Sequence, residues 1–107
     1  MAETVYVLVT IPVNNKENFI EQFNLRVAQV KQEPGCIEYG PAVDADAPFF
    51  GESLHKDDTV VTILEKWASI EDLNTHSNYM TSPECSYAGD IGPYVTGPMQ
   101  IKVLKMK

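Results

Sequence analysis

The chain has 107 residues, of which 44% are hydrophobic and 21% are charged, and this composition fits one small globular domain over residues 1–107. Fifteen acidic residues against eight basic ones give a formal net charge of −7, so the chain would repel a phosphate backbone and nucleic acid is not an expected partner. No apolar run approaches the roughly 20 residues that span a bilayer, and the N-terminus lacks a leader pattern, so we expect a cytoplasmic protein without a membrane partner.

The first half of the chain predicts a strand, a helix and a second strand. Residues 4–11 form a β-branched and aromatic run that is typical of a strand. Behind Asn15, a candidate N-cap, apolar residues recur at spacings of three and four, which indicates a helix that ends before the Pro and Gly of residues 33–35. Residues 36–43 alternate weakly between apolar and polar side chains and predict the second strand.

The second half begins with a long connection over residues 44–58, which is rich in acidic residues, Gly and Pro. Residues 59–67 are again β-branched and apolar and predict the third strand. Ser69 and Asp72 have the three-residue spacing of a capping box, which marks the start of a second helix. His76 lies on this helix.

The remaining elements complete a recognisable order. Pro83 interrupts the second helix, so residues 86–91 are predicted as a separate short helix, and residues 100–106 as a fourth strand. The order βαββαβ is that of the split βαβ fold, an α+β architecture of the ferredoxin-like type. It predicts an antiparallel four-stranded sheet with both helices on one face.

Apolar residues on both faces of the strands predict an assembly. Two helices can cover only one face, and an apolar face left in water would exceed the patch that a monomer usually tolerates. A second copy of the chain is the simplest cover, so we expect a homodimer through the open sheet face, with Val7 in that face. The alternative is that residues 44–58 fold back over their own sheet.

His76 is the strongest candidate for a chemical role. It follows the Ser69 cap by two turns and Leu73 by three positions, so it lies near the apolar stripe of the predicted helix. Imidazole titrates near neutral pH and is a natural proton acceptor there. A structural histidine packed in the core is the more common outcome for such a residue, and the residues alone leave both roles open.

Trp67 and Glu65 share one face of the third strand, because side chains alternate along a strand with a period of two. The bulk of Trp67 makes it a core residue by default, and the functional alternative is a wall against which a flat aromatic ligand stacks. Glu65 could orient a histidine or bind a ligand hydroxyl, and its structural alternative is a salt bridge at the rim.

Other residues give weaker signals. A tyrosine can contact a phenolic substrate or simply pack with its hydroxyl at the surface, and the candidates are Tyr39, Tyr79, Tyr87 and Tyr94. His55 lies in the acidic connection, where we expect it to be solvated. Cys36 and Cys85 are too isolated for a disulfide framework or a zinc site. The sequence has no nucleotide-binding, metalloprotease or serine-nucleophile motif, so we expect neither a cofactor nor a metal.

A longer pattern combines these residues. Residues 33–36 read EPGC before the second strand, which carries Tyr39, and residues 65–69 read EKWAS at the end of the third strand. Residues 72–73 and His76 follow in the next helix. This pattern spans nearly the whole chain and resembles the antibiotic biosynthesis monooxygenase domain, especially its quinol monooxygenase branch.

The resemblance implies a dimeric ferredoxin-like α/β barrel and a cofactor-free oxygenation. In such a reaction, an enzyme base takes a phenolic proton from a quinol or a related polycyclic phenolic compound, and the electron-rich anion reduces dioxygen directly. His76 would be the base and Trp67 the stacking wall. Tyr39 or Glu65 would be a polar handle for the substrate, and Tyr79 a further contact.

The chain departs from the family pattern in two places. The spacer over residues 77–82 is longer than is usual in the quinol branch, which implies a different lid and a different substrate. Family members that degrade heme need an asparagine on the first strand, and residues 4–11 contain none. Heme degradation is therefore disfavoured, despite Trp67 and His76.

A second class of function stays open, because the same scaffold can bind or isomerise small metabolites without using oxygen. A ligand-binding module would tolerate the loss of His76, whereas an oxygenase or an isomerase would need it.

Overall fold

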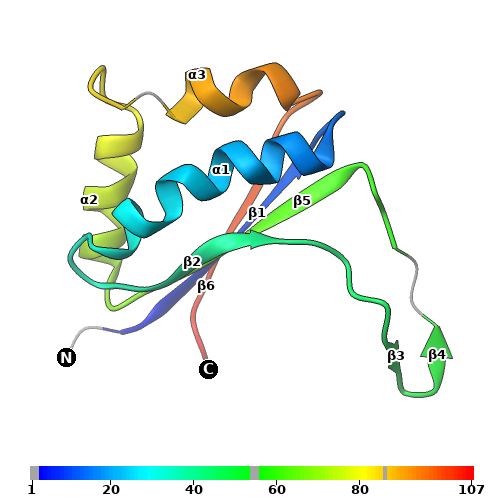
Figure 1. The fold of residues 1–107 in the computed structure, drawn as a ribbon. Coiled ribbons are helices and arrows are strands. Elements are labelled where there is room, and N and C mark those ends of the chain that lie inside the picture. Colours follow the sequence, from blue (N-terminus) through cyan, green and yellow to red (C-terminus); the bar gives the residue numbers. More distant parts are fainter. Residues whose placement is uncertain (1–2, 54–55, 86) are drawn as a thin grey trace.

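The fold is a four-stranded sheet with the helices on one side (Figure 1). The computed structural model describes residues 3–53, 56–85 and 87–107. In chain order, the elements are β1 (Val5–Pro12), α1 (Lys16–Lys31), β2 (Cys36–Ala42), β3 (Pro48–Phe49), β4 (Glu52–Ser53), β5 (Val60–Trp67), α2 (Ile70–Met80), α3 (Tyr87–Ile91), the 3-10 helix η1 (Gly92–Tyr94) and β6 (Gln100–Leu104).

The four long strands lie in the order β2-β5-β1-β6, and each neighbouring pair is antiparallel. Helix α1 connects β1 to β2, and α2 follows β5 before the chain returns as β6. This is the ferredoxin-like βαββαβ arrangement, so the predicted α+β fold is confirmed. Within the sheet, Glu65 of β5 stands between Val7 of β1 and Tyr39 of β2, which brings two of the predicted site residues together on one face.

The long helices begin where the sequence predicts. The side chain of Asn15 accepts a hydrogen bond from a backbone N–H in the first turn of α1, and the Ser69 hydroxyl accepts one from the Asp72 N–H at 3.1 Å. The same hydroxyl donates to the Asp72 carboxylate at 3.0 Å, so both groups hold the first turn of α2. Helix α2 ends before Pro83, as the missing N–H of proline requires.

The turn between α1 and β2 is tied to the start of α2. Gly35 has a positive φ of 80°, a backbone conformation that glycine adopts without steric cost. Its carbonyl accepts a hydrogen bond from the Ala68 N–H at 2.8 Å, and a Cβ added at Gly35 would overlap the Asp72 carboxylate. Glu33, which begins this turn, is thereby held close to α2.

The core lies between the sheet and the helices. Alternate residues of β1 and β5 face it together with the inner side of α1, and its buried members include Val5, Val7, Ile11, Phe19, Phe23, Val30, Val61, Ile63 and Trp67. Val7 is only 4% exposed, so the expectation that it lies in the open face of the sheet is wrong. A period of two separates the faces of a strand but does not say which face the helices cover.

The opposite face of the sheet is uncovered and mixed in character. Leu8 of β1 pairs with Leu64 of β5, and Tyr6 pairs with Lys66. The ammonium group of Lys66 lies 5.4 Å from the centre of the Tyr6 ring. Leu64 is 45% exposed, so an apolar strip crosses this face between polar neighbours.

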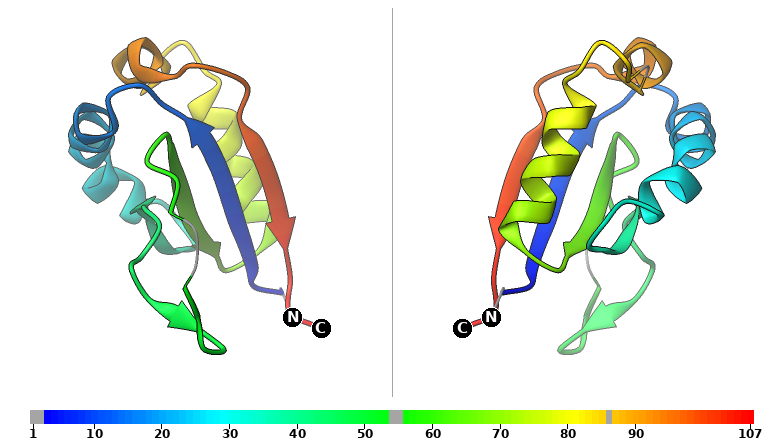
Figure 2. Two further views of the ribbon diagram at one scale, coloured as in Figure 1. Left: turned by 90° about the vertical axis from the view of Figure 1, so that its right-hand side faces the viewer. Right: turned by 90° about the vertical axis from the view of Figure 1, so that its left-hand side faces the viewer.

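The long connection contains a short hairpin that the sequence did not predict, formed by β3 and β4. It projects on the side of the sheet away from the helices (Figure 2). Phe50 lies near its tip with a φ of 55° and is 90% exposed. The hairpin does not cover the open face, because Leu64 remains exposed there, so the alternative that residues 44–58 fold over the sheet is wrong for the part of this segment that the structure describes.

Candidate functional site

Four elements bring ionisable and aromatic side chains together at one end of the core. His76 comes from α2, Glu65 and Trp67 from β5, and Tyr39 from β2. Glu33 comes from the turn after α1. The side chain of His76 is only 7% exposed and that of Glu65 only 8%, so both groups are shielded from water.

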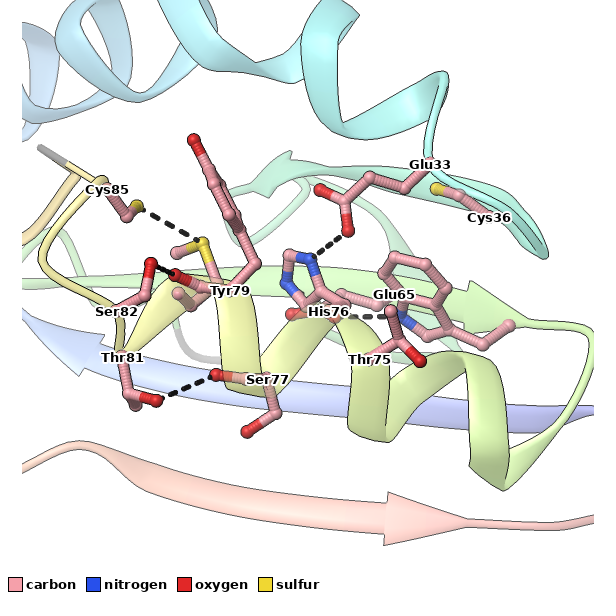
Figure 3. Close-up of polar contacts among 12 residues, drawn as sticks. Glu33, Cys36, Glu65, Thr75, His76, Ser77, Tyr79, Thr81, Ser82 and Cys85 are labelled. Atoms are coloured by element: carbon pink, nitrogen blue, oxygen red, sulfur yellow. Dashed lines mark hydrogen bonds and ion pairs between the residues drawn. The ribbon is translucent and has the colours of Figure 1, made fainter.

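His76 stands between two carboxylates (Figure 3). Its Nδ1 lies 2.9 Å from Oε1 of Glu33, which is hydrogen-bonding distance. Its Nε2 lies 4.0 Å from Oε1 of Glu65, which is too far for a direct hydrogen bond. The Glu65 Oε1 atom instead accepts a hydrogen bond from the indole N–H of Trp67 at 2.9 Å.

Aromatic rings surround His76 on two sides. The Trp67 ring centre lies 4.7 Å from that of His76 with the planes tilted by 32°, and Tyr39 meets His76 edge-on at 5.5 Å. Tyr39 also stacks on Phe23 of α1 at 5.5 Å. These contacts restrict the imidazole to one orientation, which is the condition for a precise role in proton transfer.

A cavity of about 600 Å³ opens beside this cluster. Its polar lining side chains are Tyr39, Glu65, His76 and Thr81, and its apolar ones are Val9, Ile11, Phe23, Ile63, Met80, Ile91, Val95, Met99 and Ile101. Of these, Met99 is 43% exposed and Ile101 is 64% exposed, so the cavity meets solvent near the start of β6. An apolar chamber with a few convergent polar groups is the usual form of a small-molecule site.

The structure separates the predicted site residues into two groups. Tyr39, Glu65 and His76 line the cavity. Trp67 is fully buried under His76 and is not among the lining residues. Tyr79 is partly exposed and borders a small crevice beside α1.

Among the remaining candidates, Tyr94 is not one of the residues that line the cavity. Tyr94 packs against the edge of the core and is partly buried. His55 and the side chain of Tyr87 lie outside the described residues.

Glu33, whose carboxylate contacts His76 directly, was not predicted as a site residue from the sequence. It lies in the EPGC sequence, where the following Pro and Gly account for the turn and leave no apparent need for the glutamate. A signal was nevertheless present, because an acidic residue at the C-terminal end of a helix interacts unfavourably with the helix dipole. Such a residue indicates a role other than stabilising the helix.

Burial raises the pKa of the Glu65 carboxyl above its ordinary value of 4.5. The hydrogen bond from Trp67 and the proximity of His76 act in the opposite direction, and the Glu33 charge adds to the increase. Desolvation of the charge is the largest of these effects. An ionised Glu65 therefore lowers the stability of the fold at neutral pH.

We therefore predict that Glu65→Gln stabilises the fold by an amount that depends on pH. The amide oxygen of the glutamine can still accept the hydrogen bond from Trp67. A folded-state pKa above 4.5 means that the folded protein binds more protons than the unfolded chain, so wild-type stability falls as pH rises through that pKa. The free energy of unfolding of the variant, minus that of wild type, should increase in urea titrations as the pH is raised from below 4.5 to neutral. A difference that is constant or that shrinks with pH would contradict this assignment.

The thiol of Cys36 is near the same carboxylates but is poorly suited to act as a nucleophile. Burial raises its pKa above the ordinary value of 9.0, and the charges of Glu33 and Glu65 raise it further. The reactive form of cysteine is the thiolate, so Cys36 stays protonated at neutral pH. Cys36 and Cys85 are both free thiols.

The described part of the chain has neither a cluster of metal ligands nor a membrane-spanning helix. Within residues 3–53, 56–85 and 87–107, no cluster of three or more His, Cys, Asp or Glu side chains has the geometry of a metal site. None of the helices described there has the length and the apolar character required to cross a membrane.

Solved structures share the whole fold. A candidate antibiotic biosynthesis monooxygenase from Caulobacter crescentus CB15 matches with a TM-score of 0.75 and 23% identity, over 99% of this chain and 92% of that one. One from Nitrosomonas europaea matches with a TM-score of 0.75 and 17% identity over the same shares. SnoaB, a cofactor-independent oxygenase from Streptomyces nogalater, matches with a TM-score of 0.72 and 13% identity, over 99% and 95%. At these identities the likeness shows the fold.

Sequence comparison identifies the family. No curated protein matches the chain. The family model for antibiotic biosynthesis monooxygenase matches residues 4–80, a range that includes Glu33, Tyr39, Glu65, Trp67 and His76. The chain therefore belongs to the antibiotic biosynthesis monooxygenase family.

Proposed function

We propose that the chain is a cofactor-independent monooxygenase that acts on a quinol or a related polycyclic phenolic compound, with dioxygen as the second substrate. The observation that carries this proposal is a buried histidine, flanked by two carboxylates, at the wall of a largely apolar cavity of about 600 Å³. Family membership and the shared fold with SnoaB support the reaction class.

His76 serves as the base in this proposal. It takes the proton of a phenolic hydroxyl, and the resulting phenolate gives electrons to dioxygen directly. With 1,4-naphthoquinol, the balanced reaction consumes one dioxygen and yields 2-hydroxy-1,4-naphthoquinone and one water. One oxygen atom enters the product, the other leaves as water, and the quinol supplies all the electrons.

The surrounding residues favour the charges that develop in this reaction. Beside apolar side chains, electrostatic interactions are stronger than in bulk water, and the carboxylates beside His76 stabilise the imidazolium that forms when the proton arrives. Tyr39 and Glu65 are the polar handles that would orient the substrate. Trp67 contributes by fixing His76 and Glu65 rather than by forming the cavity wall, and Tyr79 lies at the periphery of α2.

Oxygen uptake tests the proposal. The native chain, in buffer that contains a metal chelator and no flavin, is mixed with reduced 1,4-naphthoquinol, and dioxygen consumption is compared with the uncatalysed rate. We expect uptake above background that saturates with substrate. If uptake stays at background for naphthoquinols and for larger phenolic ring systems, the isomerase or ligand-binding alternative gains weight and the oxygenase proposal fails.

We also propose that the chain forms a homodimer through the open face of the sheet. The apolar strip formed by Leu8 and Leu64 gains free energy when it is removed from water, at about 25 cal/mol per Å². The β3–β4 hairpin projects on the same side (Figure 2), so it would flank a second copy docked there. Phe49 and Phe50 expose an aromatic pair on this hairpin, with ring centres 4.4 Å apart.

A charge placed in the apolar strip should prevent this association. In Leu64→Lys, the new ammonium group would face the partner sheet without an opposite charge, and burying it is costly, so we expect the variant to elute as a monomer in sizing chromatography. Leu25→Lys is the matched control, because Leu25 is an exposed leucine on α1, and it should remain dimeric. A dimeric Leu64→Lys variant or a monomeric wild type would refute this interface.

A further inference from the structure

The two carboxylates beside His76 are placed differently. Glu33 Oε1 is within hydrogen-bonding distance of Nδ1, at 2.9 Å, whereas Glu65 Oε1 is 4.0 Å from Nε2 and is already engaged by the Trp67 indole. Glu65 lines the cavity, whereas Glu33 is not among the lining residues. The Nε2 edge of the imidazole therefore faces the cavity, and the Nδ1 edge faces away from it.

A carboxylate offers only acceptor atoms, so its hydrogen bond to Nδ1 requires a proton on that nitrogen. In the neutral ring, the other nitrogen then carries the lone pair. The tautomer of a histidine is in this way set by the partner of one nitrogen, and it decides which nitrogen can accept a proton.

The backbone on both sides of Glu33 is fixed, so its carboxylate is well placed for this task. The Glu33 N–H donates to the Val30 carbonyl at 2.9 Å, and the Glu33 carbonyl accepts from the Cys36 N–H at 3.1 Å. Two residues later, the Gly35 carbonyl accepts a hydrogen bond from the N–H of Ala68, which follows β5. The Glu33 side chain is 21% exposed, less than is usual for a surface glutamate.

We infer that Glu33 is a positioning residue that holds neutral His76 with its proton on Nδ1, so that the Nε2 lone pair faces the cavity as the base. This inference rests on the proposed function for its role in catalysis, but the tautomer itself is a property of the free protein. Once Nε2 has accepted a proton, the Glu33 carboxylate also stabilises the imidazolium.

Ring ¹⁵N NMR of the free protein tests the tautomer without any substrate. At a pH where His76 is neutral, we expect the wild-type spectrum to show a protonated Nδ1 and an unprotonated Nε2. In Glu33→Gln, the amide can face His76 with either its oxygen or its NH₂ group, so we expect a mixture of the two tautomers. A wild-type ring protonated on Nε2, or a variant that keeps the wild-type pattern, would overturn the inference.

Kinetics with reduced naphthoquinol provide the second readout. Because Glu33 does not line the cavity, Glu33→Gln should lower kcat about tenfold or more while KM changes little. Glu21→Gln is the matched control, since it removes one exposed carboxylate of α1, and it should leave kcat and the His76 spectrum unchanged. An unchanged kcat in Glu33→Gln would refute the catalytic part of the inference.

If Glu33→Gln does not fold, Glu33→Ala removes the carboxylate without adding an amide, and an Nδ1 proton that persists fully in the folded Ala variant would overturn the inference. If the native chain consumes no dioxygen, the proposed function fails, while the wild-type tautomer still confirms or refutes the contact.

Discussion

Replacing His76 with Ala is expected to lower kcat/KM for reduced naphthoquinol by at least about 100-fold, because a positioned general base contributes roughly 10²–10⁴ to a rate. The replacement leaves the cavity open and leaves Glu33 and Glu65 without the group between them. A carboxylate is a weaker base than imidazole, so neither neighbour would replace it efficiently. Oxygen uptake measures the effect directly.

Two further variants make the His76 result specific. His76→Gln keeps a hydrogen-bonding side chain of similar length but has no basic nitrogen, so we expect it to be as inactive as His76→Ala. Asn74→Ala changes an exposed residue of the same helix and should keep full activity. If His76→Gln retains more than about a tenth of the wild-type rate while its fold is intact, His76 is not the base.

Trp67→Ala is expected to destabilise the fold by about 3–5 kcal/mol, the range for removing a large aromatic side chain from a core. Trp67 has no exposed surface, and its ring packs against that of His76. The variant would also leave the buried Glu65 carboxylate without its indole donor, and a buried acceptor without a partner adds to the loss. Urea unfolding monitored by circular dichroism measures the change.

Trp67→Phe separates packing from hydrogen bonding, because it keeps an aromatic ring and removes the N–H. We expect Trp67→Phe to lower the free energy of unfolding by less than Trp67→Ala does. It should still lower the activity, since Glu65 is released from its fixed position. Ile70→Ala is the control, because Ile70 is half-exposed at the start of α2, and surface changes usually stay within about 0.5 kcal/mol. A Trp67→Ala variant as stable as this control would contradict the supporting role of Trp67.

The sequence predicted the elements of the fold well, because local signals define most of them. Asn15 and Ser69 cap the helices that their side-chain chemistry indicates, and Pro83 lies beyond the end of α2. The β3–β4 hairpin was missed because each strand has two residues, too few for a periodic pattern. Val7 was placed on the wrong face, since alternation alone carries no information about where the helices pack.

The site was predicted in part. His76, Glu65 and Tyr39 were chosen for their chemistry and for the family pattern, and the structure brings them to one cavity. The contact between Glu33 and His76 joins residues 43 positions apart, and a contact of such range depends on how α1, the Gly35 turn and α2 pack together. No local pattern encodes that packing. The burial of Trp67 agrees with its default assignment to the core, but the same limit explains why the contact of its ring with His76 was not foreseen.

The fate of the oxygen atoms tests the proposed chemistry most directly. The native chain is supplied with reduced 1,4-naphthoquinol under ¹⁸O₂, without flavin and with a metal chelator, and the product is analysed by mass spectrometry. A cofactor-independent monooxygenase gives a hydroxynaphthoquinone that carries one ¹⁸O atom, at a rate that His76→Gln abolishes. An unlabelled naphthoquinone with an equal amount of hydrogen peroxide, or labelling that persists in His76→Gln, would contradict it.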